Sequence, residues 1–145
     1  MKIIIIGPPG SGKGSQAELL QKKLRLKHIP LGEILRQEIK NNTPIGKKVK
    51  SISKGILAQD YIVDKLVNKI IKGKDNFILD GYPRHLAQAR YLDKIIKVDK
   101  VFLFDLPNNL IIKRLTNRYV CVCGETYNLL SKKPKRNLTC DKCKK

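Results

Sequence analysis

The sequence contains no hydrophobic run long enough to cross a membrane. A spanning helix needs roughly 18 consecutive apolar residues, and the apolar start Ile3–Ile6 ends already at Gly7-Pro8-Pro9. That start is also too short for a secretory signal peptide, so we expect a cytoplasmic protein. Internal repeats and low-complexity linkers are absent as well. The 145 residues therefore fit one domain, or one domain that carries a small insert.

Acidic residues are scarce. The chain has 12 Asp and Glu against 31 Lys and Arg, which gives a formal net charge of +19. This excess suits a polyanionic partner such as nucleic acid, an anionic membrane or a phosphorylated ligand. Heavy use of Lys, Ile and Asn is also typical of AT-rich genomes, so charge alone does not choose a function. The hydrophobic content of 41% supports a packed core and excludes a disordered basic tail.

Three short apolar runs predict buried strands of a parallel sheet, at residues 3–6, 77–79 and 101–104. Segments with helical periodicity lie between and after these runs, and Asp60 is a possible N-cap of one of them. The predicted helices cover residues 17–24, 31–40, 49–53, 61–71, 86–96 and 110–118. Strands that alternate with helices predict a doubly wound α/β sheet. From Tyr119 onward the periodic pattern gives way to a separate small unit with four cysteines.

A glycine-rich segment, Gly7-Pro8-Pro9-Gly10-Ser11-Gly12-Lys13-Gly14-Ser15, lies between the first strand and the first helix. Glycines allow successive backbone N–H groups to point at an anion, and the helix N-terminus adds partial positive charge. A lysine in this context reaches a transferred phosphate. Gly14 separates Lys13 from Ser15, whereas a strict Walker A motif has Ser or Thr directly after the lysine. The segment therefore predicts a phosphate-binding loop of a P-loop NTPase-like fold.

With this loop and its Gly-Lys-Gly-Ser ending, the sequence resembles the adenylate kinases. Leu31-Gly32-Glu33-Ile34-Leu35-Arg36 is similar to that family's Thr-Gly-Asp-x-Leu-Arg segment, and Asp80-Gly81-Tyr82-Pro83-Arg84 with Gln88 is similar to its Asp-Gly-Phe/Tyr-Pro-Arg…Gln signature. Phe104-Asp105-Leu106-Pro107 follows in the same order. The resemblance implies a core in residues 1–30 and 61–118, a helical insert that binds the nucleoside monophosphate in 31–60, and a partial lid in 119–145.

The resemblance also implies the roles of individual residues in phosphoryl transfer from Mg-ATP to AMP. The catalytic residues would be Lys13, Asp80, Arg84 and Arg118, with Asp80 orienting waters around Mg²⁺. The ATP-binding residues would be Gly10, Ser11, Gly12, Lys13, Gly14, Ser15, Arg114, Arg118, Thr126 and Tyr127. The AMP-binding residues would be Leu31, Arg36, Ile56, Leu57, Ala58, Gly81, Tyr82, Pro83, Arg84 and Gln88. Arg36 and Arg84 would clamp the phosphate, and Gln88 would read the edge of the base.

Two positions depart from the family pattern. Leu31 stands where the family has Thr, and Glu33 where it has Asp, so we expect altered affinity for AMP or altered base preference. His28 and His85 match no catalytic position of the family, and we assign them no role.

Four cysteines follow in two pairs, Cys121-x-Cys123 and Cys140-x2-Cys143, separated by 16 residues. This spacing is close to that of a four-thiolate zinc site, and free thiols are the alternative. Disulfides are not expected in a cytosolic α/β protein. The lids of zinc-bearing adenylate kinases resemble this tail, but their first pair is Cys-x2-Cys. The one-residue separation strains the geometry without forbidding it, and the zinc would be structural.

Adenylate kinases continue beyond this lid with acidic residues, two further arginines, a last core strand and C-terminal helices. None of these is visible before Lys145. We therefore expect a C-terminally truncated member that binds nucleotide but catalyses weakly or not at all by itself. In the family the missing strand pairs beside residues 101–104, so we also expect an exposed sheet edge, low stability and self-association, whereas the intact family is expected to be monomeric.

Two other functions stay open on the sequence. A related nucleoside monophosphate kinase with another base preference differs only in its nucleotide site, where Gln88 favours AMP. A nucleic-acid-binding module would use the basic tail, which has seven basic and two acidic residues in 121–145. Most of the excess charge lies outside that tail, without the interleaved aromatic residues of a strand-binding groove, and this argues against nucleic acid.

Overall fold

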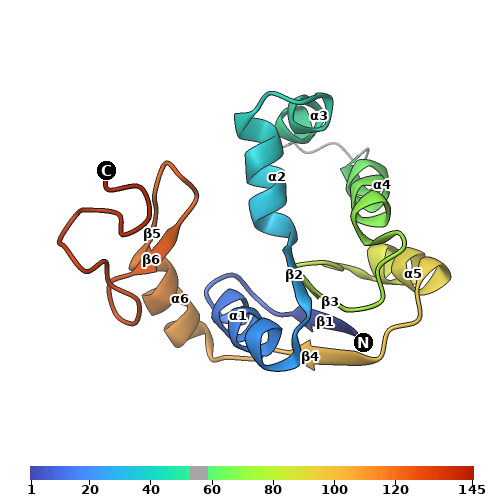
Figure 1. Ribbon diagram of the computed structural model, residues 1–145, viewed down its shortest axis with the longest axis horizontal. Helices are drawn as coiled ribbons and strands as arrows, with labels where there is room; N and C mark the ends of the chain where they lie inside the picture. The colour runs from blue at the N-terminus through green and yellow to red at the C-terminus, as the bar shows by residue number, and fades with distance from the viewer. Residues whose placement is uncertain (53–58) are drawn as a thin grey trace. The chain divides into compact units, whose positions relative to one another are not determined.

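The computed structural model describes residues 1–52 and 59–145 (Figure 1). The chain divides into two compact units. The first comprises Met1–Gly7 with Lys13–Leu103, and the second comprises Pro8–Gly12 with Phe104–Lys145. None of the helices formed by the described residues is both long and apolar enough to span a membrane.

A four-stranded parallel sheet forms the centre of the first unit. Its strands are β1 (Lys2–Ile6), β2 (Lys27–Pro30), β3 (Phe77–Asp80) and β4 (Lys100–Leu103), in the order β2-β3-β1-β4. The apolar runs of β1 and β3 are buried, as the sequence predicts for inner strands of a parallel sheet. The predicted α/β fold with a parallel sheet is therefore confirmed.

The described part of the first unit contains five helices. They are α1 (Lys13–Leu24), α2 (Leu31–Lys40), α3 (Pro44–Ile52), α4 (Gln59–Ile71) and α5 (Leu86–Ile95). In Figure 1, α2 leads away from the sheet to α3, and α4 leads back towards it. Ile4, Leu79 and Val67 belong to one buried core cluster, which shows that the sheet and α4 pack on the same apolar interior.

Two elements differ from the sequence-based expectation. Strand β2 was not predicted, because Ile29 is its one buried residue and a four-residue segment that ends in Pro30 gives no apolar run. Helix α3 begins at Pro44, not at residue 49. Proline is favoured in a first helical turn, and Thr43 caps this turn by accepting a 3.0 Å hydrogen bond from the Gly46 amide on its hydroxyl.

Strand β4 lies at an edge of the sheet, with β1 as its one neighbour among the described residues. Its apolar side chains are exposed, with 57% of Val101, 39% of Phe102 and 68% of Leu103 accessible to solvent. Because consecutive residues of a strand point to opposite faces, neither face of β4 is fully covered. An exposed apolar edge at this strand was expected from the sequence.

The second unit contains α6 (Asn108–Thr116), β5 (Arg118–Val120) and β6 (Thr126–Asn128). Strands β5 and β6 form an antiparallel pair. The helix ends at Thr116, whereas the sequence predicted helix as far as residue 118. Asn117 terminates it, since its side-chain amide donates to the Lys113 carbonyl at 2.9 Å while Arg118 starts the strand. The Asn128 side chain donates to the Arg114 carbonyl at 2.8 Å and so ties β6 to α6.

A buried hydrogen bond joins α4 to the segment after β3. The Tyr82 hydroxyl donates to Asp64 Oδ1 at 2.5 Å, and both side chains are buried. Burial and this hydrogen bond raise the pKa of Tyr82 well above its usual range. Tyr82→Phe leaves the buried carboxylate without this donor, so we expect a loss of about 1–3 kcal/mol in unfolding free energy. Denaturant unfolding measures it, with the exposed Tyr61→Phe as control. Equal stabilities of the two variants would contradict this role.

Candidate active site

The phosphate loop belongs to the second unit from Pro8 to Gly12. Gly10 and Gly12 have φ angles of 80° and 95°, which favour glycine, and the Ser11 amide donates to the Pro8 carbonyl at 3.2 Å. Arg114 of α6 donates from Nη1 to the carbonyls of Ser11 and Gly10, at 3.1 and 3.5 Å. The Arg114 guanidinium thus occupies carbonyl oxygens of the loop. The backbone N–H groups of such a loop are the groups that bind an anion.

Gly10 is required for conformation and for space. A Cβ on this residue would lie 3.1 Å from Leu115 Cγ. We expect Gly10→Ala to lower stability by about 1–2 kcal/mol for the backbone conformation alone, with a further loss from the contact. Gly73→Ala is the matched control, since Gly73 also has a positive φ but no atom within 4 Å of its added Cβ. Thermal unfolding compares them, and an equal loss in both would exclude a role for the Leu115 contact.

Lys13 directly follows the loop and begins α1 in the first unit, with Gly14 and Ser15 in the same turn. The first N–H groups of a helix have no intrahelical partner. Together with the helix dipole they favour an anion at this end. The Lys13 ammonium, the α1 N-terminus and the loop are therefore consecutive groups that suit phosphates.

Asp80 ends β3, at the carboxyl edge of the sheet where α/β proteins bind ligands. Its Oδ2 lies 3.9 Å from the position of a Cβ on Gly14, so the carboxylate faces the first turn of α1. His28 of β2 places Nε2 at 3.3 Å from the same oxygen, and the side chains of His28 and Asp80 are only 10% and 12% exposed. No role was expected for His28, because a contact between neighbouring strands has no signal in local spacing. A carboxylate next to a phosphate site suits the water shell of Mg²⁺.

Two arginines converge in the first unit. Above Gly32, Nη1 of Arg36 and Nη2 of Arg84 lie 3.5 and 3.9 Å from the position that a Cβ would occupy. Arg84 Nε donates to the Gly81 carbonyl at 3.0 Å, which orients its guanidinium. Two guanidinium groups around a glycine without a side chain form a compact positive site, and their paired N–H groups match phosphate oxygens.

Gln88 follows Arg84 by four positions in the sequence and is 5% exposed. Its Oε1 accepts from the Arg84 amide at 2.9 Å, and its Nε2 donates to Asp60 Oδ1 at 2.9 Å. His85 Nε2 lies 2.8 Å from the same Asp60 oxygen. Helix α4 starts at Gln59, so Asp60 lies inside the first turn and is not the N-cap that the sequence suggested. The Asp60 carboxylate is instead engaged by His85 and Gln88.

The structure places the other predicted AMP-site residues differently. The side chains of Leu31 and Tyr82 are buried in the core cluster, so they support the site from beneath. Gly81 has a φ of 81° and Pro83 follows the buried tyrosine. The predicted contacts of Ile56, Leu57 and Ala58 lie outside the described residues.

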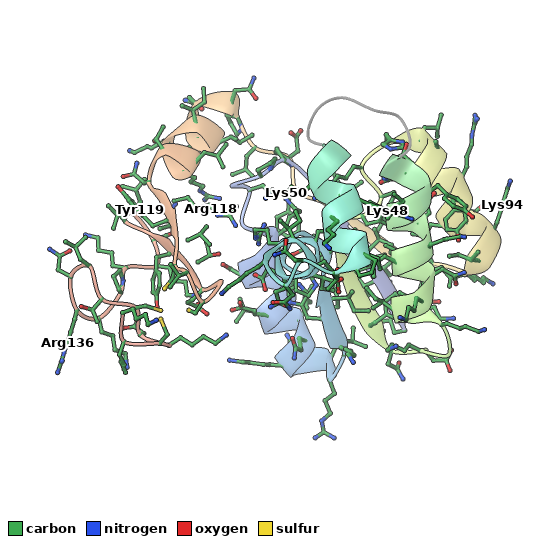
Figure 2. All side chains as sticks on the ribbon, turned by 90° about the horizontal axis from the view of Figure 1, so that it is seen from above. Lys48, Lys50, Lys94, Arg118, Tyr119 and Arg136 are labelled. Carbon is green, nitrogen blue, oxygen red and sulfur yellow. The ribbon has the colours of Figure 1, made fainter. Side chains whose placement is uncertain are left out.

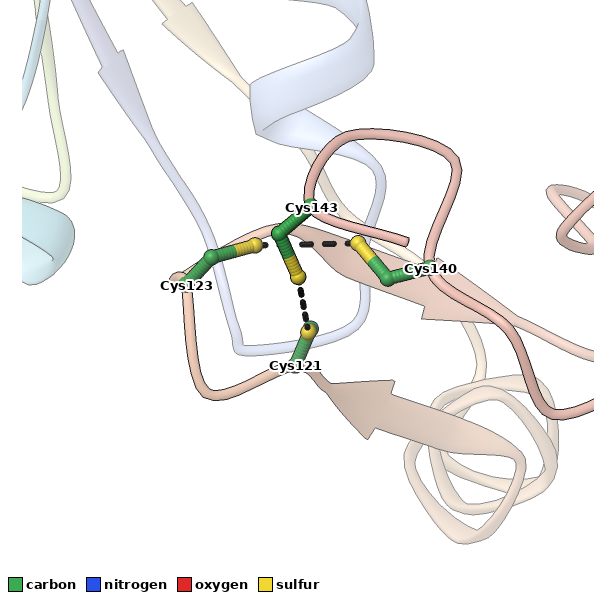
Figure 3. A group of neighbouring side chains, drawn as sticks. All are labelled: Cys121, Cys123, Cys140 and Cys143. Atoms are coloured by element: carbon green, nitrogen blue, oxygen red, sulfur yellow. Dashed lines mark hydrogen bonds between the residues drawn. The ribbon is translucent and has the colours of Figure 1, made fainter. Parts of the chain in front are cut away.

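The four cysteines come together in the second unit (Figure 3). Their sulfur atoms all lie within 4.8 Å of one another. Cys121 and Cys143 approach to 3.4 Å, and Cys123 and Cys140 to 3.6 Å. Tetrahedral zinc with Zn–S bonds of about 2.3 Å requires sulfur separations of about 3.8 Å. The cluster therefore has the donors and the spacing that a tetrahedral metal needs.

The short Cys-x-Cys pair reaches this arrangement through a tight turn. The Gly124 amide donates to the Cys121 carbonyl at 2.8 Å, and the Cys121 amide donates to the Glu125 carbonyl at 2.8 Å. Gly124 has a φ of 91°, which its lack of a side chain permits. The turn thus brings both sulfurs to one side, despite the missing residue.

Hydrogen bonds set the charge state of this cluster. The Tyr127 hydroxyl lies 3.4 Å from Cys140 Sγ, and this bond together with the amides of Cys143 and Lys142 lowers the pKa of Cys140 to about 6. The same bond raises the pKa of Tyr127 to about 12. At Cys121 a backbone hydrogen bond from Cys123 lowers the pKa, but burial and the neighbouring thiols outweigh it and raise the value to about 12. A thiolate at Cys140 suits metal binding.

The remaining predicted ATP-site residues lie on the strands of the second unit. Arg118 is exposed on β5, while Thr126 Oγ1 on β6 is buried and has no hydrogen-bond partner among the described residues. Tyr127 is buried, and its hydroxyl accepts from the Asp141 amide at 2.7 Å, so its side chain supports the cysteine cluster.

The basic residues are spread over several elements. Figure 2 shows Lys48 and Lys50 on α3, Lys94 on α5, and Arg118 with Tyr119 on β5. Arg136 lies in the loop between the cysteine pairs. The labelled basic side chains thus come from separate elements and not from one continuous segment.

Comparison with known proteins identifies the family. The family model described as "Adenylate kinase" matches residues 5–144. Adenylate kinase of Petrotoga mobilis is 41% identical over 150 residues, covering 99% of this chain and 70% of that protein. Adenylate kinase of Caldicellulosiruptor bescii is 40% identical over 153 residues, covering 99% of this chain and 71% of that protein. That of Thermotoga neapolitana is 41% identical over 153 residues, with coverages of 98% and 70%. The chain belongs to the adenylate kinase family.

Proposed function

We propose that this chain is a nucleoside monophosphate kinase that transfers the terminal phosphoryl group of ATP to AMP and forms two molecules of ADP. The observation that carries the proposal is the convergence of Arg36 and Arg84 over Gly32, in a chain that also has a phosphate loop. A reaction between two nucleotides needs one phosphate site for each. The relatives named above supply the identity of the substrates.

In this reaction an oxygen of the AMP phosphate attacks the terminal phosphorus of ATP, and the bond from that phosphorus to the bridging oxygen of the ADP leaving group breaks. Little covalent chemistry is asked of the protein, so positioning and charge stabilisation supply the catalysis. Lys13, the loop amides and Ser15 bind the ATP phosphates. Arg36 and Arg84 bind the AMP phosphate, and Arg84 also stabilises the migrating charge.

Mg²⁺ supplies further positive charge on the ATP phosphates when it is bound. Asp80 is the residue that would hold its water shell, and the 3.3 Å contact from His28 keeps that carboxylate in place. Arg114 and Arg118 are proposed to contact ATP, as is Thr126. For Arg114 the support is its hydrogen bond to the Ser11 carbonyl of the loop. For Thr126 it is the buried hydroxyl that has no hydrogen-bond partner among the described residues.

We further infer that Cys121, Cys123, Cys140 and Cys143 hold a structural zinc ion. The support is the sulfur spacing and the number of thiolates, because four protein ligands are typical of structural zinc sites. The cytoplasmic location and the monomeric state remain predictions from the sequence.

The test is ADP formation from ATP and AMP by the purified chain, followed by chromatography of the nucleotides. We expect slow ADP formation that depends on both substrates and on Mg²⁺. Turnover that approached the roughly 1–100 s⁻¹ typical of kinases would overturn the expectation of weak catalysis. Lys13→Ala should abolish ADP formation, and Lys22→Ala, an exposed lysine of the same helix, should not. A folded chain that neither forms ADP nor binds ATP and AMP at high concentrations of both nucleotides would contradict the proposal.

A further inference from the structure

Asp60 stands out among the residues around the candidate AMP site because two side chains share one of its oxygens. Gln88 Nε2 donates to Asp60 Oδ1 at 2.9 Å, and His85 Nε2 lies 2.8 Å from the same atom. Asp60 comes from α4, while Gln88 lies in α5 and His85 directly precedes that helix. The sequence suggests an N-cap at Asp60 and assigns His85 no role, so neither residue was expected at a nucleotide site.

The two ends of the Gln88 amide are held by partners of opposite kinds. At one end Oε1 accepts from the Arg84 backbone N–H at 2.9 Å, and at the other Nε2 donates to the Asp60 carboxylate. A backbone N–H can only donate, and a carboxylate can only accept. If the amide were turned over, its oxygen would face the carboxylate and its NH₂ would face the N–H. Both contacts would be repulsive, so one orientation is strongly favoured.

The fixed amide keeps one hydrogen-bonding position free at each end. A side-chain amide has two N–H donors and an oxygen with two lone pairs. After the bonds to Asp60 and Arg84, one N–H and one lone pair remain. Gln88 is 5% exposed, so water gives little compensation for a mismatched ligand at these positions.

The free N–H and the free lone pair of the Gln88 amide match a 6-amino purine better than a 6-oxo purine. Adenine presents an amino donor beside a ring-nitrogen acceptor, and an amide binds these two groups through its oxygen and its nitrogen. On the Watson–Crick edge, hypoxanthine and guanine present the reverse order, a carbonyl oxygen beside a ring N–H. A Gln88 amide in the reversed orientation would bind these two bases equally well. The Asp60 carboxylate disfavours that orientation.

We propose that Asp60 is a positioning residue that determines base selectivity, by holding the Gln88 amide in the orientation that accepts 6-amino purines and rejects 6-oxo purines. The inference rests on the proposed function, in which Gln88 reads the base of the monophosphate. His85 is the second donor to the same oxygen and restrains the Asp60 carboxylate, whose side chain is 39% exposed.

The test compares the dissociation constants of AMP and inosine monophosphate by calorimetry on the full chain. Asp60→Asn offers Gln88 either a carbonyl oxygen or an NH₂ group, so both amide orientations find a partner. We expect the preference for AMP to fall about tenfold, the lower part of the range for a single unsatisfied group. Asp60→Glu, which remains an acceptor, should retain most of the preference. Asp93→Asn, the same charge change at an exposed position of α5, should leave it unchanged.

Two further variants separate this proposal from the function on which it rests. Gln88→Ala should remove the preference, and Asp60→Asn added to Gln88→Ala should cause no further change. If Gln88→Ala removes the preference and Asp60→Asn retains it within twofold, the positioning role is wrong while the kinase function stands. If the wild-type chain binds neither monophosphate, the proposed function itself has failed.

A measurement on the wild-type chain covers the case in which Asp60→Asn does not fold. The side-chain amide protons of Gln88 should exchange with water much more slowly than those of Gln37, which is exposed on α2. Exchange at the same rate in both residues would overturn the proposal, because an amide held at both ends is protected.

Discussion

Replacing Arg84 by alanine is expected to lower the rate of ADP formation from ATP and AMP by about 10³-fold, the scale of a single arginine that stabilises the transferring phosphoryl group. Its guanidinium converges with that of Arg36 over Gly32 and is oriented by the Gly81 carbonyl. The alanine variant removes a cation that acts on the migrating charge, so kcat should fall and not only the affinity for AMP. Steady-state rates at saturating substrate concentrations measure the effect.

Arg90→Ala is the matched control for this experiment, because Arg90 is an exposed arginine on the following helix, α5. It removes the same charge at a distance of six positions along the chain. We expect its rate to stay within about twofold of wild type, as for surface substitutions in general. A fall of less than tenfold in the Arg84 variant, or an equal fall in the Arg90 variant, would contradict the assigned role.

Replacing Cys140 by serine is expected to abolish the proposed zinc binding and to unfold the segment of the second unit that contains the cysteines. Cys140 is buried, its pKa is lowered to about 6, and Tyr127 contacts its sulfur. Loss of one of four thiolates should weaken zinc binding by about 100-fold or more, since even an outer partner of a metal ligand accounts for about 10–100-fold. Metal analysis of the purified chain and limited proteolysis of residues 104–145 measure the two effects.

The control for the zinc experiment is Thr139→Ser, next to Cys140 in sequence. Its hydroxyl donates to the Asn137 carbonyl at 3.3 Å, and serine can retain this bond. One zinc per chain is expected in the control and in the wild type. A folded wild-type chain that contains no zinc, with four cysteines that react at once with a thiol reagent, would contradict the assignment.

The sequence was most informative where one local pattern determines the structure. The apolar runs of β1 and β3 are buried on both faces, so composition alone indicates them. The loop before Lys13 combines glycines, a strand and a helix within a short segment, and its positive φ angles follow from that composition. The cysteine pairs predicted a metal cluster, and the sulfurs do come together.

Long-range pairing explains what the sequence did not indicate. Strand β2 has a single buried residue and is recognisable only through its pairing with β3. The partners of His28 and His85 are aspartates 52 and 25 positions away, and no local spacing relates them. Asp60 is a residue type that commonly caps helices, but its carboxylate contacts His85 and Gln88, which lie 25 and 28 positions away.

Binding of the bisubstrate analogue diadenosine pentaphosphate is the most direct test of the central claim, that one chain provides phosphate sites for both nucleotides of one reaction. Calorimetry on the full chain should give one analogue per chain. Arg84→Ala and Lys13→Ala should each weaken the binding, while Arg90→Ala should leave it unchanged. Absence of binding to the folded wild-type chain, or equal affinity in all variants, would contradict the account.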